Sequence, residues 1–264
     1  MIGMLIDVTR CIGCEQCVAA CVAENGLDPD LADRDRATAP DGLSANRFTT
    51  VEPVGWNRLA KKACMHCLEP SCVSACLVGG LTRQENGAVV YDPEKCIGCR
   101  YCMLACPFHI PRYQWSKTVP FVRKCELCRD RLAEGKIPAC VEACPQQAIA
   151  FGTREEMLLE AQRRIESDDR YFNWIWGKTE FGGTGVLYIS DVDLGELGWP
   201  GTKTEAIPKM VAPVLHATPW LAGSVLAGVT GIQWIVKRRM EQMREDSPQS
   251  TGEAMDHSDG KHRP

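Results

Sequence analysis

The chain has 264 residues, enough for one or two domains that each bury a hydrophobic core. Hydrophobic residues make up 45% and charged residues 24%, which argues against collagen, a coiled coil, wholesale disorder and a membrane protein with many spans. The formal net charge of -4 gives no indication of a nucleic-acid partner. The unusual feature is the presence of 16 cysteines, all of which lie between Cys11 and Cys144.

The segment before the first cysteine, Met1–Asp7, has neither the basic start nor the long apolar run of a secretory leader, and no twin arginine precedes Cys11. We therefore expect no export signal on this chain. The cysteines that follow are closely and repetitively spaced, whereas small disulfide-rich secreted domains space theirs irregularly. This pattern favours metal ligation over disulfide bonding.

The cysteines form four groups of four. The first and third groups read C-x2-C-x2-C-x3-C, and Pro107 follows the third, which is the spacing of bacterial ferredoxins that bind [4Fe-4S] clusters. The second group reads C-x2-C-x4-C-x3-C and the fourth reads C-x2-C-x11-C-x3-C, with a longer stretch before the third cysteine. In chain order the groups are Cys11, Cys14, Cys17 and Cys21; Cys64, Cys67, Cys72 and Cys76; Cys96, Cys99, Cys102 and Cys106; and Cys125, Cys128, Cys140 and Cys144.

The spacing also predicts how the groups pair. Short C-x2-C loops wrap the chain around one cluster, and the fourth cysteine starts a helix that points away and serves a neighbouring cluster. Groups two and three are joined by residues 77–95, with a turn signal at Glu85–Gly87 and a strand at Ala88–Tyr91, so they pair with each other, and groups one and four pair across them. The four expected ligand sets are Cys11, Cys14, Cys17 and Cys144; Cys125, Cys128, Cys140 and Cys21; Cys64, Cys67, Cys72 and Cys106; and Cys96, Cys99, Cys102 and Cys76.

Structural zinc is the alternative, since zinc sites also use C-x2-C pairs. Zinc ribbons separate their two pairs widely, so the repeated groups favour iron–sulfur clusters. Gly13 and Gly98 allow tight turns that direct backbone N–H groups toward sulfur. His66 and His109 lie beside cysteines, and we expect neither to be a ligand because every set is complete in cysteine. Nearby basic residues either offset the negative charge of the clusters or form a solvated face: Arg10, Lys61, Lys62, Lys95, Arg100, Arg123, Lys124 and Arg129.

The other segments provide scaffold. Residues 25–59 form an insertion rich in Asp, Pro, Gly and Ala that we expect at the surface, with a strand at Arg47–Val51. Thr153–Glu156 is a capping box that opens a helix with one apolar face packed on the outer cysteine unit. Phe181–Ser190 predicts a glycine turn that leads into a strand.

A long uncharged segment follows. Residues 210–236 contain no Asp, Glu, Lys or Arg, which at about 1.5 Å per residue is enough to cross a hydrocarbon core of about 30 Å. Trp220 and Trp234 lie toward its two ends, as interfacial aromatics do. Pro213 and Pro219 suggest that the regular helix starts near Pro219. A buried helix of a globular domain is the alternative to a single membrane span.

The charges around this segment predict its orientation. The basic run Lys237–Arg239 indicates a cytoplasmic C-terminus, which places the cysteine-rich part in the periplasm. Without a leader, the chain would be exported together with a partner that carries a twin-arginine signal. The polar residues from Ser247 to the end are expected to be disordered.

The expected fold is α+β: two tandem ferredoxin-like two-cluster units, one inserted in the other, and a C-terminal transmembrane helix. The expected parts are the outer unit at residues 1–24 and 119–165, the insertion at 25–59, the inner unit at 60–118, a strand and loop extension at 166–209, the membrane anchor at 210–236 and the polar tail at 237–264.

The cysteine order and the C-terminal span resemble a known family. It is the four-cluster ferredoxin-like electron-transfer (beta) subunit of membrane-bound formate dehydrogenases and hydrogenase-2-type nickel–iron hydrogenases. Leu77 is a departure, since proline usually follows the fourth cysteine, and it costs no ligand. The stretches that carry the resemblance are Lys62–Cys67, Cys99–Met103, Lys124–Cys128, Ala139–Pro145 and Phe151–Glu156.

The resemblance implies a subunit without catalytic residues of its own. It would relay electrons through four [4Fe-4S] clusters between a catalytic subunit and an integral membrane subunit of the quinone-reactive, cytochrome b type. The catalytic partner would be a molybdenum or tungsten formate dehydrogenase or a nickel–iron hydrogenase, and membrane lipid would surround the span. Two alternatives stay open: a subunit that feeds electrons from quinol to a terminal molybdoenzyme reductase, and an assembly or anchoring module whose clusters hold the fold.

Overall fold

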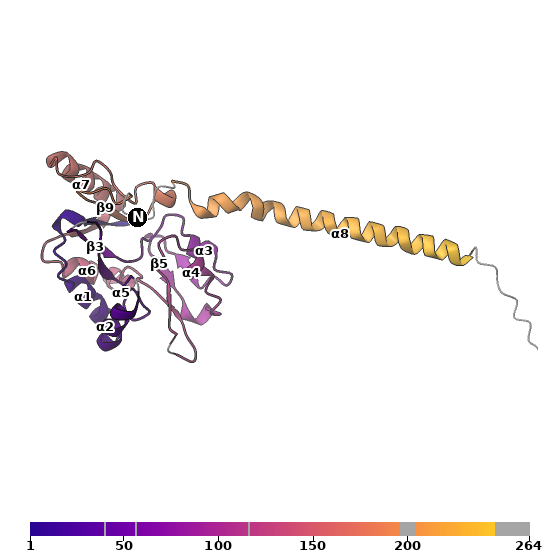
Figure 1. The fold of residues 1–264 in the computed structure, drawn as a ribbon, viewed down its shortest axis with the longest axis horizontal. Helices are drawn as coiled ribbons and strands as arrows, with labels where there is room; N and C mark the ends of the chain where they lie inside the picture. Colours follow the sequence, from indigo (N-terminus) through magenta and orange to yellow (C-terminus); the bar gives the residue numbers. More distant parts are fainter. Residues whose placement is uncertain (40, 56, 116, 196–203, 246–264) are drawn as a thin grey trace, which may run out of the picture. The chain divides into compact units, whose positions relative to one another are not determined.

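The structure, a computed structural model, describes residues 1–39, 41–55, 57–115, 117–195 and 204–245. The chain divides into two compact units, Met1–Val211 and Ala212–Pro264. The first unit is built from short helices and strands and contains every cysteine (Figure 1). The second contains most of one long helix, α8 (Ile207–Glu245). The described part of the chain is therefore a mixed helix and strand protein with one apolar C-terminal helix.

The largest sheet joins three segments that lie far apart in the sequence. Its strands are β1 (Ile2–Asp7), β8 (Ile149–Thr153) and β9 (Val186–Ile189), in the order β8-β1-β9. Strand β1 is antiparallel to β8 and parallel to β9, with Leu5 opposite Leu187. The strand expected within Phe181–Ser190 is confirmed as β9, whereas its parallel pairing with the first strand was not predicted.

Helix α7 (Arg154–Ser167) covers this sheet, and both expected features of it are confirmed. The Thr153 hydroxyl accepts a hydrogen bond from Glu156 N at 3.2 Å, and the Glu156 carboxylate accepts one from Thr153 N at 2.8 Å. One face of the helix packs on the sheet in a cluster of buried side chains. The cluster consists of Met157, Ala161, Ile165, Leu5, Ile175, Leu187 and Ile189.

Replacing Thr153 with alanine is expected to destabilise the first turn of α7 by about 1 kcal/mol, because the side-chain acceptor for a terminal N–H is lost. Amide hydrogen exchange at Glu156 should then become about fivefold faster. A Thr153→Ser variant keeps the hydroxyl and should exchange at the wild-type rate. Equal rates in the alanine variant and the wild type would show that the cap contributes nothing.

The segment between the first two cysteine groups, which its composition predicts at the surface, contributes several buried side chains to the core. It forms α2 (Pro29–Thr38) and the antiparallel hairpin of β2 (Thr50–Pro53) and β3 (Leu59–Lys62). Leu27, Ala32 and Phe48 are buried in a core cluster that also contains Cys21. The few apolar residues of this segment therefore pack against the first cysteine group, and the strand expected at 47–51 is placed slightly later as β2.

The strands after the second cysteine group form a second hairpin. Strands β4 (Leu81–Arg83) and β5 (Val89–Tyr91) are antiparallel, and the expected turn closes them with a hydrogen bond from Gly87 N to Gln84 O of 2.9 Å. Strands β6 (Arg112–Tyr113) and β7 (Val122–Arg123) form a third short pair. The remaining elements are the short helices η1 (Val8–Arg10), α1 (Gln16–Glu24), α3 (Ser71–Ser74), η2 (Pro93–Lys95), α4 (Tyr101–Ala105), α5 (Arg129–Ala133), α6 (Ala139–Glu142) and η3 (Glu180–Gly182).

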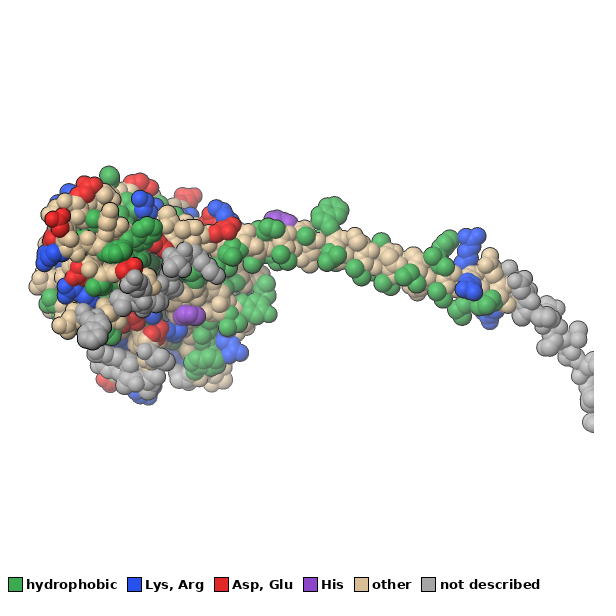
Figure 2. Space-filling model, turned by 45° about the horizontal axis from the view of Figure 1, so that its top comes forward, with side chains coloured by type: hydrophobic (Ala, Val, Ile, Leu, Met, Phe, Trp, Pro, Cys, Tyr) green, Lys and Arg blue, Asp and Glu red, His purple; other side chains and the backbone are tan. Residues whose placement is uncertain are grey.

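Helix α8 is long and apolar enough to cross a membrane, with a mean hydropathy of 1.3 and none of its most apolar stretch buried within the structure. Figure 2 shows hydrophobic side chains along its length and Lys and Arg side chains near its C-terminal end. The expectation that the regular helix starts near Pro219 is wrong, since α8 begins at Ile207 and contains Pro213 and Pro219. Each proline removes only one ladder hydrogen bond, and apolar spanning helices tolerate such gaps. The tail expected from Ser247 onward lies outside the described residues.

Candidate metal centres

All four C-x-x-C loops share one backbone feature. The residue before the second cysteine has a positive φ in every loop, which turns the chain tightly between the two thiols. These residues are Gly13 (φ 72°), His66 (φ 45°), Gly98 (φ 71°) and Leu127 (φ 61°). The turn also directs backbone N–H groups to sulfur: Gly98 N donates to Cys96 Sγ at 3.4 Å, and Leu127 N donates to Cys125 Sγ at 3.4 Å. The tight turn that we expected from glycine therefore also occurs in the loops of groups two and four, where His66 and Leu127 adopt a positive φ.

A second feature recurs after the fourth cysteine of groups two, three and four. The chain turns back there through a residue with positive φ whose N–H donates to the carbonyl of that cysteine. The pairs are Gly79 with Cys76 at 3.3 Å, His109 with Cys106 at 3.1 Å, and Gln147 with Cys144 at 3.2 Å. Group one differs, because Cys21 lies inside α1 and the helix continues to Glu24. The sequence spacing thus corresponds to repeated local geometry.

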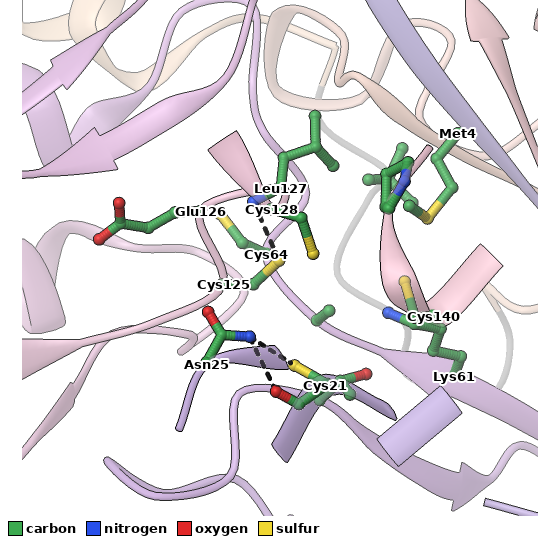
Figure 3. A pocket seen from close by; sticks show the side chains of 14 residues that line it. Met4, Cys21, Asn25, Lys61, Cys64, Cys125, Glu126, Leu127, Cys128 and Cys140 are labelled. Atoms are coloured by element: carbon green, nitrogen blue, oxygen red, sulfur yellow. Dashed lines mark hydrogen bonds between the residues drawn. The ribbon is translucent and has the colours of Figure 1, made fainter. Parts of the chain in front are cut away.

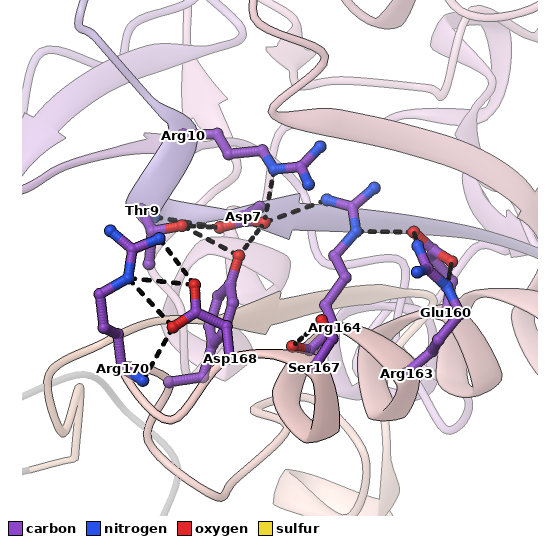
Figure 4. Close-up of polar contacts among 10 residues, drawn as sticks. Asp7, Thr9, Arg10, Glu160, Arg163, Arg164, Ser167, Asp168 and Arg170 are labelled. Atoms are coloured by element: carbon purple, nitrogen blue, oxygen red, sulfur yellow. Dashed lines mark hydrogen bonds and ion pairs between the residues drawn. The ribbon is translucent and has the colours of Figure 1, made fainter.

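A capped 3-10 turn leads into groups one and three. The Asp7 carboxylate accepts a hydrogen bond from Thr9 N at 3.1 Å, just before Cys11, and Asp92 accepts one from Glu94 N at 3.0 Å, just before Cys96. Asp7 is fully buried, and Arg164 of α7 donates to it at 3.0 Å (Figure 4). The packed helix therefore fixes the turn that presents the first group of cysteines.

Two cavities in the first unit are lined by sets of cysteines that are far apart in the sequence. These are the same cysteines that the spacing predicts for the two outer ligand sets. One cavity is lined by Cys11, Cys14, Cys17 and Cys144, and the other by Cys21, Cys125, Cys128 and Cys140 together with Cys64. Figure 3 shows the sulfur atoms of the second set around a common space. The fold thus brings groups one and four together.

The inner cysteines are also close neighbours. Burial and, after it, the charges of three nearby thiols raise the pKa of the Cys67 thiol, and together the same two effects raise that of Cys102 to about 11. The thiols around Cys67 are those of Cys64, Cys106 and Cys72, and those around Cys102 are Cys76, Cys96 and Cys99. Here too the neighbours are the members of the sets expected from spacing, while ligation itself stays a prediction.

Neighbouring sets approach each other in a fixed order. Three pairs of thiols from different sets lie near enough that the charge of one raises the pKa of the other. They are Cys17 with Cys140, Cys64 with Cys125, and Cys72 with Cys102. Cys14 and Cys99, which belong to the first and last sets of this series, are the two exposed cysteines of the sixteen. The middle two sets lie between these exposed ends.

The donor chemistry fits an iron–sulfur cluster. Burial and the charges of nearby thiols together raise the pKa of the Cys17 thiol to about 11 although Lys61 lowers it, so a bound cation would be needed to hold the group as thiolates. Four thiols placed around a cavity fit a group of several metal atoms, whereas zinc draws its sulfurs to about 2.3 Å from one centre.

Two of the basic residues that sequence singled out are buried. Lys61 lines both outer cavities and is 3% exposed, and the thiolates of Cys140, Cys125 and Cys17 raise its pKa against the opposing effect of burial. Lys124 is equally buried, and its ammonium donates to Val89 O and, at 3.0 Å, to Cys125 O. Because these two lysines are buried, they do not belong to a solvated basic face, and charge compensation is the interpretation that fits them.

The two histidines beside cysteines have different surroundings. His109 is exposed, whereas His66 is 2% exposed and lies between the inner and outer cysteines. Burial and the charges of Lys124 and Lys61 hold the pKa of His66 well below its ordinary value, so its imidazole is neutral. No periodicity or spacing in the sequence distinguishes these histidines, because the difference arises from contacts between distant segments.

Comparison with known proteins agrees with this chemistry. The profile of the 4Fe-4S dicluster domain matches residues 56–154. A protein of Nitratidesulfovibrio vulgaris is 37% identical, over 96% of this chain and 71% of the relative. The hydrogenase-2 operon protein HybA of Escherichia coli is 34% identical, over 87% of this chain and 83% of the relative. The iron–sulfur subunit of the nitrate-inducible formate dehydrogenase of Escherichia coli is 37% identical, over 71% of this chain and 67% of the relative.

Proposed function

Because the chain belongs to the family of electron-transferring iron–sulfur subunits of formate dehydrogenase and hydrogenase-type complexes, we propose that it relays electrons through four [4Fe-4S] clusters. The relay runs between a catalytic oxidoreductase subunit and a quinone-reactive membrane subunit. The relatives are iron–sulfur subunits of such complexes, which is consistent with a non-catalytic role. When bound, such clusters supply one-electron transfer, and the chain supplies their spacing, insulation and hydrogen bonds.

The observation that carries this proposal is the serial arrangement of the four cysteine sets. The set with Cys14 adjoins the set with Cys140, which adjoins the set with Cys64, which adjoins the set with Cys99. We propose that each set holds one cluster and that electrons pass along this series. Two ferredoxin-like units account for it: hairpin β4–β5 connects groups two and three, and the pairing of β8 with β1 connects groups four and one.

The exposed ends of the series are where partner subunits would dock. Ile12 and Ile97 occupy the same position in the two C-I-G-C loops and are 60% and 64% exposed. Each lies beside an exposed cysteine, Cys14 or Cys99. An apolar side chain next to an exposed thiol fits a subunit interface that excludes water from an electron path. We therefore assign one loop to the catalytic partner and the other to the membrane partner.

The site of action that we propose is the membrane surface. Helix α8 spans the bilayer once, and the basic run Lys237–Arg239 after it favours a cytoplasmic C-terminus and a periplasmic cysteine unit. Export would then depend on a partner that carries its own signal.

Metal analysis tests the number of clusters. Four clusters of four irons predict about sixteen irons and sixteen acid-labile sulfides per chain in complex purified without oxygen. Treatment with an iron chelator should remove the colour and the paramagnetic-resonance signals of the reduced protein together. About eight irons per chain would contradict the four-cluster proposal, and zinc in place of iron would contradict the relay altogether.

A further inference from the structure

We propose that His66 and Asn25 donate hydrogen bonds to the sulfurs of Cys125 and Cys21 and so give the cluster held by Cys21, Cys125, Cys128 and Cys140 a raised reduction potential. This inference rests on the proposed function, because it requires a cluster at that set. It concerns how the chain gives one of four proposed clusters, all with four cysteine ligands, a different reduction potential.

The ring of His66 can donate in only one direction. Val89 N donates to His66 Nδ1 at 3.0 Å, so Nδ1 is the acceptor nitrogen of the ring. A neutral imidazole then carries its proton on Nε2. His66 Nε2 lies 3.7 Å from Cys125 Sγ, within reach of an N–H···S contact. The backbone N–H of Val89 on β5 thus selects the His66 tautomer that is protonated on Nε2.

A second hydrogen bond fixes the main chain at His66. The His66 carbonyl accepts a hydrogen bond from Gly185 N at 2.9 Å, just before β9. A Cβ at Gly185 would lie 3.0 Å from that carbonyl, so glycine allows this close approach without crowding. The main chain of His66 is therefore held by Gly185 and its ring by Val89, so the ring cannot turn away from Cys125 without breaking the hydrogen bond from Val89 N.

Asn25 supplies a second donor to the same set. Its side-chain amide donates to Cys21 O at 2.8 Å and to Cys21 Sγ at 3.6 Å (Figure 3). The sulfur contacts given above at Cys96 and within the fourth group come from backbone N–H groups, which accompany the loop wherever it occurs. Two side-chain donors that converge on one set are additional to that common pattern.

These contacts have a definite electrical consequence. A donor N–H next to a ligating sulfur stabilises the more negative, reduced state of a cluster and raises its potential. Burial strengthens the effect because less solvent screens the dipole. The affected set lies inside the series, between the set with Cys14 and the set with Cys64, so the potential would peak at an interior position of the relay.

The test is a redox titration followed by paramagnetic resonance on the full complex, prepared without oxygen. We expect His66→Phe to lower the midpoint potential of one cluster and leave the others unchanged, and Asn25→Leu to lower that of the same cluster. His109→Phe is the matched control, since His109 is exposed and follows the third group, and it should shift none.

Iron content separates the possible failures. Wild-type complex without iron would overturn the proposed function itself. Full iron content with no shifted potential in either variant, or with a different cluster shifted in each, would overturn the present inference alone. If one variant loses iron, the midpoint potential of the other variant tests the inference. Asn25 is half-buried and His66 is buried, so one substitution can disturb cluster binding while the other does not.

Discussion

Replacing Cys99 with alanine is expected to abolish electron transfer between the catalytic subunit and quinone. Cys99 belongs to the set at one exposed end of the series, and the loss of one ligand removes that end. The remaining sets then have no connection to the partner that docks there. The measurement compares quinone-linked turnover with turnover of an artificial dye that accepts electrons directly from the catalytic subunit, and only the first should disappear.

Thr82→Ala is the matched control for this variant. Thr82 is exposed on β4 of the same part of the chain and is not a cysteine, so both activities should stay at the wild-type level. Loss of dye reduction in Cys99→Ala to the same extent as quinone reduction would show that the cysteine serves assembly rather than electron transfer. That result would favour the anchoring module over the relay.

Ending the chain at Val211 is expected to release it from the membrane when the span is its only attachment. This cut keeps the first compact unit whole and removes the apolar part of α8. Buried leucine or valine side chains each contribute about 1.5–3 kcal/mol on transfer out of water, so the intact helix partitions almost completely into lipid. Alkaline extraction of membranes from cells without partner subunits measures this, with full-length protein expected in the pellet and truncated protein in the supernatant.

A point substitution gives a graded version of the same experiment. Leu226→Arg places a charge within the span at a cost of about 3 kcal/mol and should decrease the pelleted fraction. Leu159→Arg changes an equally exposed leucine on α7 and should leave it unchanged. Protease added to sealed cells or inverted vesicles reads the orientation, in cells that do contain the partner subunits on which export depends. Cleavage of the cysteine unit from the cytoplasmic side alone would contradict the periplasmic assignment.

The sequence predicted local structure best where the function of a motif requires a fixed spacing between its residues. The four C-x-x-C loops, the capping box at Thr153 and the apolar stretch at 210–236 are local patterns, and each corresponds to a described element. The grouping of neighbouring thiols could also be anticipated, because a fourth cysteine three residues after the third points away from its own loop. The neighbouring thiols in the structure belong to the same sets, although ligation awaits the metal.

What could not be predicted depends on contacts between distant segments. The parallel pairing of β1 with β9 joins residues 182 positions apart, such as Met4 and Val186, and leaves no periodic signal in either strand. The insertion looked polar on average, yet Phe48 packs against the first cysteine group because a few apolar residues suffice for a small core. His66 and His109 look alike beside their cysteines, and only the tertiary fold buries one of them.

The nested chain path bears on how the protein matures during translation. Groups two and three and hairpin β4–β5 are complete once residue 106 has emerged from the ribosome, whereas the two outer sets need Cys140 and Cys144 and the main sheet needs β9. Domains fold progressively from the N-terminus as they are synthesised. Under the proposed function, the inner pair of cysteine groups would therefore be the first to receive iron, and the outer groups would close around it last.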